Sequence, residues 1–125
     1  MDGLRDFLGD LKRHHYARGN FLGLLNILIG RRIETSGGKV LSQGLPWRAA
    51  AEMLKRVRWD KDAIREVGLD PGELPPRDRL RYWYLTIAHA RVDSEEATQA
   101  GDRLAEMLQG HGYVIGPGPR AGAEP

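Results

Sequence analysis

The sequence predicts a mainly α-helical fold: a single compact bundle of five or six helices with a small inserted β-hairpin. Apolar residues recur at helical spacing along most of the chain, capping residues separate the blocks, and the helical period disappears only between residues 31 and 45. With 125 residues, of which 41% are hydrophobic and 29% charged, the chain fits one globular domain. We expect a helical domain over residues 1–115 and a disordered tail over 116–125.

The first predicted helix runs from residue 2 to about residue 17. Its apolar residues between Leu4 and Leu11 follow the i, i+3, i+4, i+7 spacing of one helical face. Gly19 is then suited to a left-handed residue after the helix, and Asn20 to the cap of the next helix. These residues predict a break before residue 21.

The second predicted helix, from Phe21 to about Gly30, is apolar on nearly every side. Such a helix belongs at the centre of a fold. Gly23 lowers its helix propensity by about 1 kcal/mol relative to alanine, which indicates that another backbone passes close by. The hairpin is then expected at about residues 32–42, around a turn at Gly37 and Gly38.

Helices resume after the hairpin, because the 3.6-residue period returns and is divided by caps and glycines. Trp47 and Met107 are placed on the buried stripes of their helices, and Asp93 is expected to cap the last helix. A short third strand is possible at residues 113–115. Caps included, the predicted helices span residues 46–58, 60–68, 76–91 and 93–110.

Composition excludes several function classes. The chain has no cysteine, which removes disulfides, thiolate catalysis and cysteine-based metal sites. The most apolar run, Phe21–Ile29, has nine residues, whereas a membrane-spanning helix needs about 20. The first residues lack the features of a signal peptide. We therefore expect a cytoplasmic protein that does not contact a membrane.

Histidines are the main candidates for catalysis or metal binding. Adjacent side chains such as His14 and His15 point about 100° apart on a helix, so both cannot reach one metal ion there. His89 and Asp93 are four residues apart, but Asp93 is better explained as a helix cap. A small enzyme or ligand-binding domain would have to unite these histidines with a carboxylate. We expect no catalytic residue, no metal site and no cofactor.

Nucleic-acid binding is an alternative interpretation. The predicted helix–break–helix of Pro46–Gly68 has the outline of a helix-turn-helix, and the hairpin would be its wing. The second helix, however, is acidic at its N-terminal end, and it lacks the Asn and Gln that read adenine. Backbone contacts through basic helix faces remain an alternative. Their candidate residues are Arg48, Lys55, Arg56, Arg58, Arg77 and Arg81.

Protein–protein interaction is the interpretation that the sequence favours. A helix cannot bury three consecutive aromatic residues, so Tyr82 is expected to point away from the core. Trp59 and Trp47 lie near helix ends, and aromatic and arginine side chains dominate binding at protein interfaces. We predict a non-enzymatic helical interaction module, or a small subunit of a larger assembly, that binds another protein or itself. The candidate contact residues are Trp59, Tyr82, Arg58 and Trp47.

Overall fold

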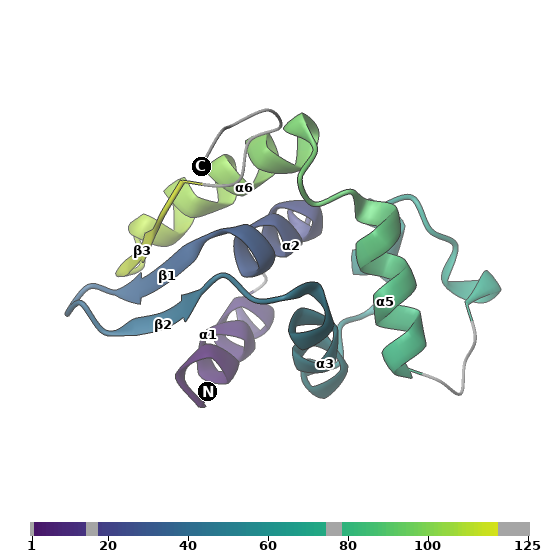
Figure 1. The fold of residues 1–125 in the computed structure, drawn as a ribbon, viewed down its shortest axis with the longest axis horizontal. Coiled ribbons are helices and arrows are strands. Elements are labelled where there is room, and N and C mark those ends of the chain that lie inside the picture. Colours follow the sequence, from purple (N-terminus) through teal and green to yellow (C-terminus); the bar gives the residue numbers. More distant parts are fainter. Residues whose placement is uncertain (1, 15–17, 75–78, 118–125) are drawn as a thin grey trace.

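The computed structural model describes residues 2–14, 18–74 and 79–117. Within these ranges the chain forms six α-helices, one 3-10 helix and a three-stranded antiparallel sheet (Figure 1), which confirms the predicted mainly α fold. The elements are α1 (Asp2–Arg13), α2 (Phe21–Gly30), β1 (Arg32–Thr35), β2 (Val40–Gln43), α3 (Trp47–Val57), α4 (Lys61–Glu66), η1 (Pro71–Glu73), α5 (Arg79–Ala90), α6 (Glu95–Gln109) and β3 (Tyr113–Ile115).

Helix α2 lies at the centre of the fold, between α6 on one side and α1 and α3 on the other (Figure 1). Its residues from Gly23 to Leu28 are all buried. A Cβ atom on Gly23 would lie 2.5 Å from the carbonyl oxygen of Ala100 in α6. The glycine therefore lets the two helix backbones approach closely, as its position in the sequence predicts.

The three strands form one antiparallel sheet in the order β2-β1-β3. Ile33 in the central strand pairs with Ser42 on one side and with Ile115 on the other, and all three are buried. The hairpin and the short third strand are both confirmed. The sheet lies at the opposite end of the molecule from α5 (Figure 1), whereas α4 packs against α2 and η1.

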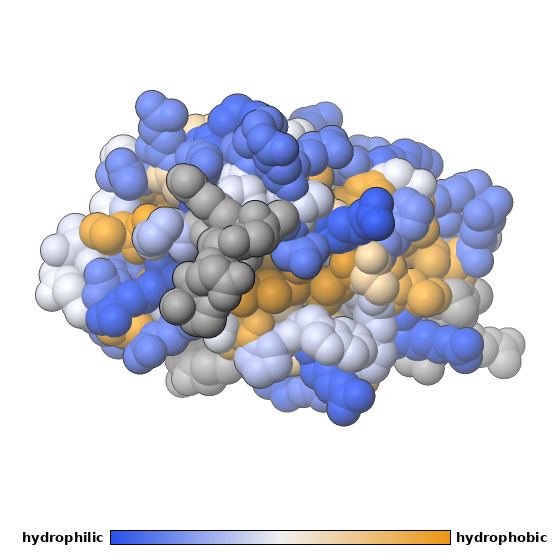
Figure 2. All heavy atoms as spheres, turned by 45° about the horizontal axis from the view of Figure 1, so that its top comes forward, coloured by the Kyte–Doolittle hydropathy of each residue, from blue (hydrophilic) through white to orange (hydrophobic). Residues whose placement is uncertain are grey.

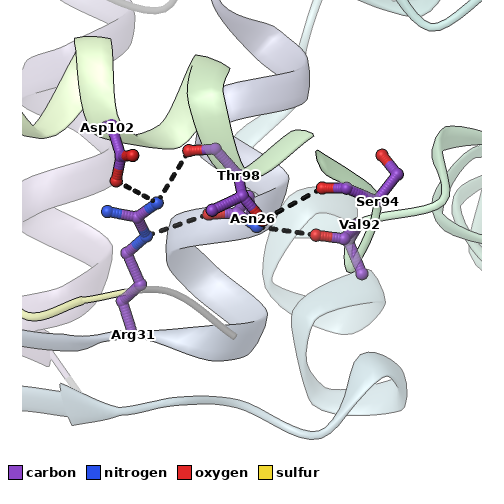
Figure 3. Close-up of polar contacts among 6 residues, drawn as sticks. All are labelled: Asn26, Arg31, Val92, Ser94, Thr98 and Asp102. Atoms are coloured by element: carbon purple, nitrogen blue, oxygen red, sulfur yellow. Dashed lines mark hydrogen bonds and ion pairs between the residues drawn. The ribbon is translucent and has the colours of Figure 1, made fainter. Parts of the chain in front are cut away.

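A buried polar cluster joins α2 to α6 (Figure 3). Arg31 is only 2% exposed, and its guanidinium lies 2.8 Å from the carboxylate of Asp102. It also donates to the side-chain oxygen of Asn26 and to the carbonyl of Thr98, each at 2.9 Å. Asn26 in turn donates to the carbonyl of Val92 at 2.7 Å. Arg31 is thus a structural residue, because its donors are used inside the protein.

Four local expectations are wrong. Asn20 occupies the cap position of α2, but its side chain makes no capping hydrogen bond. Ser94, not Asp93, caps α6, since its hydroxyl accepts from the Ala97 N–H at 3.1 Å. Trp47 is 44% exposed because it is the first residue of α3, and Met107 is 45% exposed because it lies at the edge of the buried stripe of α6.

The predicted tail lies mostly outside the described residues, which end at residue 117. Gly116, the first residue assigned to that tail, still donates its N–H to the carbonyl of Arg32 at 2.9 Å. Pairing with β1 therefore continues one residue beyond β3.

Candidate binding cleft

A cleft of about 500 Å³ opens between the end of α3, η1 and the start of α5. Three aromatic residues line it, namely Trp59, Tyr82 and Trp83. Four cations also line it, namely Lys55, Arg58, Lys61 and Arg79, and all four are exposed. We call this site the basic-aromatic cleft. Its volume is in the range of small-ligand and side-chain pockets, roughly 300–1,000 Å³.

The aromatic wall of the cleft is continuous with the hydrophobic core. Trp83 is only 3% exposed, and its ring meets that of Tyr82 edge to face at 4.9 Å between centroids. The buried ring of Phe21 lies 5.6 Å from Trp59 and 6.0 Å from Trp83. Phe21 thus fixes Trp83 in the core. The partly exposed ring of Trp59 packs on Phe21, and that of Tyr82 packs on Trp83.

The turn after α3 sets the position of Arg58. This residue has a left-handed backbone, with φ of 56°, and its N–H donates to the carbonyl of Leu54. Lys12 from α1 donates to the carbonyls of Val57 and Arg58, so a cation neutralises the C-terminal end of α3. A non-glycine residue in this conformation is strained by roughly 1–3 kcal/mol, and such strain often marks functional sites.

Two aspartates fix the backbone of the segments that form the remaining sides of the cleft. The side chain of Asp60 caps α4 by accepting from the Ala63 N–H at 3.1 Å, as the sequence predicts, and this places Lys61 at the start of the helix. Asp70 accepts from the Gly72 N–H at 2.9 Å and starts η1. Both carboxylates act on the backbone, and neither lines the cleft.

The four cations of the cleft make no ion pair within the described residues. Some other basic residues have partners: Arg48 lies over the ring of Trp47 at 5.3 Å from the centroid. Side-chain ion pairs join Arg13 to Asp10, Arg31 to Asp102, Arg32 to Glu34 and Arg65 to Asp62. The cleft therefore presents positive charge that the described part of the chain does not neutralise.

Two aromatic residues of the lining carry uncharged donor groups. The Nε1 atom of Trp59 is buried and has no hydrogen-bond partner in the part of the chain that the structure describes. A buried donor without an acceptor is unfavourable by about 1–3 kcal/mol. Burial raises the pKa of the Tyr82 phenol above its ordinary value of 10.0, so this hydroxyl is protonated at neutral pH and can donate.

A second pocket lies on the other side of Trp59 and has a different charge. Its lining includes the carboxylates of Asp60, Asp62 and Glu66 as well as Lys12 and Arg18. Mixed charges there contrast with the cleft, whose charged lining residues are all cations. Cations without carboxylates therefore line the cleft, whereas cations and carboxylates line the second pocket together.

An apolar groove of about 580 Å³ lies elsewhere, between the C-terminal ends of α2 and α5 and the start of α3. Ile29, Leu45, Trp47 and Ile87 line it, and the ring of Trp47 meets Tyr84 edge to face at 4.9 Å. On the face turned forward in Figure 2, a band of hydrophobic residues lies between hydrophilic ones.

The predicted site residues fall into two groups. Trp59, Tyr82 and Arg58 lie together in the cleft with Lys55, whereas Trp47 lines the apolar groove. Outside the cleft, Arg56 and Arg81 are exposed and Arg48 stacks on Trp47, while Arg77 lies outside the described residues. Two further cations of the cleft, Lys61 and Arg79, are not among the predicted site residues. The signals in the sequence are weak: Lys61 directly follows the Trp59–Asp60 break, and Arg79 is three residues before Tyr82.

The described histidines do not line any of the three pockets. Among the described residues, none of the cleft, the neighbouring pocket and the apolar groove has a histidine in its lining, and His14 and His89 are both exposed. His15 lies outside the described residues. Over the same ranges, no three His, Asp or Glu side chains are grouped so that they could hold a metal ion. No described helix has both the length and the apolar character needed to cross a membrane.

No protein-family model, curated protein or solved structure matches this chain. Its function is therefore inferred from the chemistry of its own residues.

Proposed function

We propose that this chain is a non-enzymatic protein-interaction module whose basic-aromatic cleft binds an acidic segment of a partner protein. The observation that carries the proposal is the combination of four cations without an ion pair in the described residues and three aromatic rings in one cleft. Aromatic and arginine side chains supply most of the binding energy at protein interfaces. Carboxylates of the partner would neutralise the cations and accept from the Tyr82 hydroxyl.

Nucleic acid is the competing ligand, since its phosphates also seek cations. A nucleic-acid strand needs a basic surface that follows its backbone over several phosphates. Among the three pockets, the cleft is the one whose charged lining residues are all cations: carboxylates line the other two, Arg31 is buried, and Arg32 and Arg65 are paired. With a net charge of only +2, the whole chain also attracts a polyanion weakly. A short acidic peptide fits this distribution better.

The test uses degenerate peptide libraries of fixed length, one rich in Asp and Glu and one with the corresponding amides. We expect the intact protein to bind the acidic library and not the neutral one, as measured by fluorescence anisotropy. The double variant Lys55→Glu, Arg58→Glu should bind the acidic library at least about tenfold more weakly, because two attractive charges become repulsive.

The matched control is the double variant Arg56→Glu, Arg103→Glu, which reverses two exposed cations outside the cleft. It changes the net charge equally and should retain more of the affinity. Equal losses in the two double variants would reduce the binding to a net-charge effect and contradict the proposal. Tighter binding of a single-stranded oligonucleotide with the same number of charges would support a nucleic-acid partner instead.

A further inference from the structure

If the cleft binds an acidic segment, its donors indicate which acid it takes. Every charged side chain of the lining is a cation, and Tyr82 adds a residue with a hydroxyl donor. A single carboxylate brings one charge and two oxygens, so it leaves most of these donors without an acceptor. A phosphate monoester brings a charge of about −1.5 to −2 and three strong acceptor oxygens. The donor set therefore matches phosphate better than carboxylate.

The uncharged part of the lining indicates what carries the phosphate. Three aromatic rings, together with Pro71 and Leu74, form an apolar surface directly beside the cations. The partly exposed rings of Trp59 and Tyr82 pack at their inner sides on Phe21 and Trp83, so they are held in place for contact with a further ring. Aromatic pairs stabilise by about 0.5–1.5 kcal/mol beyond burial of their area.

We infer that the basic-aromatic cleft recognises a phosphotyrosine side chain of the partner protein. The ring would lie against Trp59 and Tyr82, and the phosphate among the cations, with Arg58 and Arg79 as bidentate donors. This inference rests on the proposed function and deepens it. It makes phosphorylation of the partner the event that controls binding.

The test extends the acidic peptide library by fixing its central residue as tyrosine, phosphotyrosine, phosphoserine or glutamate. Binding is measured by anisotropy at one salt concentration, with a free nucleoside monophosphate as a competitor. We expect the phosphotyrosine library to bind about tenfold more tightly than the glutamate library, because a second charge and a third oxygen are added. The phosphoserine library should bind more weakly than the phosphotyrosine one, since it lacks the ring.

The alternative results separate this inference from the proposed function. Equal affinity for the glutamate and phosphotyrosine libraries overturns the inference and leaves the acidic-segment proposal intact. Equal affinity for phosphoserine and phosphotyrosine removes the role of the ring and also overturns it. Displacement of the phosphotyrosine library by low concentrations of the nucleoside monophosphate assigns the cleft to a nucleotide. Failure of every acidic library to bind overturns both proposals.

Single variants locate the phosphate. Arg58→Gln and Arg79→Gln should each weaken binding of the phosphotyrosine library by about tenfold and affect the unphosphorylated tyrosine library less. Arg56→Gln and Arg103→Gln, which alter exposed cations outside the cleft, are the matched controls. All four residues are exposed, so a circular dichroism spectrum is enough to check the fold. Equal losses for phosphorylated and unphosphorylated libraries would contradict a phosphate contact at Arg58 or Arg79.

Discussion

At the N-terminus of α2, the capping group comes from another helix. Asn20 occupies the cap position, but its side chain makes no capping hydrogen bond. The carboxylate of Glu66 in α4 accepts instead from the Phe21 N–H at 2.6 Å and from the Gly19 N–H at 3.0 Å. One side chain therefore satisfies two backbone donors and ties α4 to the central helix.

Removal of the Glu66 carboxylate is expected to destabilise the fold. Glu66→Ala leaves two backbone donors without their acceptor and should lower the free energy of unfolding by about 1–2 kcal/mol. Glu66→Gln keeps an acceptor oxygen and should lower the free energy of unfolding by less than Glu66→Ala does. Urea denaturation of the two variants at neutral pH compares them. Equal losses in the two variants would show that the negative charge, and not the hydrogen bonds, provides the stabilisation.

The same residue predicts a pH dependence. Partial burial raises the pKa of Glu66 above its ordinary value of 4.5 and outweighs the hydrogen bonds from Phe21 and Gly19, which lower it. The folded protein therefore binds this proton more tightly than the unfolded chain does. Stability contributed by Glu66 should fall as pH rises from about 4.5 through the raised pKa. Relative to Glu66→Gln, the natural protein should gain stability as pH is lowered; a difference that is constant with pH would contradict this.

At the scale of elements, the close packing of α2 against α6 organises the fold. Gly23 lies against the backbone of Ala100, and Gly101 lies against Asn26 and Arg31 of the buried polar cluster. Each helix thus supplies a glycine where the other needs space. The absent side chains let Arg31 reach Asp102 and the Thr98 carbonyl.

One substitution at two glycines tests this packing. Gly23→Ala places a methyl group 2.5 Å from a backbone oxygen, so the helices must separate, and the expected loss is about 1–3 kcal/mol. Gly9→Ala, within α1, meets no atom within 4 Å and should stabilise by about 0.5–1 kcal/mol through helix propensity. Thermal unfolding should give a lower midpoint temperature for Gly23→Ala and a higher one for Gly9→Ala than for the natural protein. A neutral Gly23→Ala would contradict the close approach of the helices.

Local patterns explain why much of the fold could be predicted. The apolar period of α2 and Gly23 within it indicate a central helix, and Asp60 caps α4 as expected, because these signals lie within a few residues of their effect. The Glu66 cap on α2 joins groups 45 residues apart, and so does the contact of Lys12 with Val57. No local pattern encodes such pairs. Four cleft residues (Lys55, Arg58, Trp59 and Tyr82) were predicted from their types alone, but Lys61 and Arg79 join them only through folding.

At the scale of the whole molecule, the fold separates two kinds of surface. The apolar groove contains Trp47, and the basic-aromatic cleft contains Trp59 and Trp83. The three tryptophans of the chain therefore report on both surfaces. Each indole N–H gives its own proton–nitrogen signal in an NMR spectrum, so binding can be located without any substitution.

The most direct test of the central claim is an NMR titration of the protein with the acidic peptide library. If the cleft is the binding site, the indole signals of Trp59 and Trp83 should shift with increasing peptide, and the Trp47 signal should stay in place. Added salt should reverse these shifts, because charge drives the binding. A shift of the Trp47 signal while Trp59 and Trp83 stay unchanged would move the interface to the apolar groove and contradict the account.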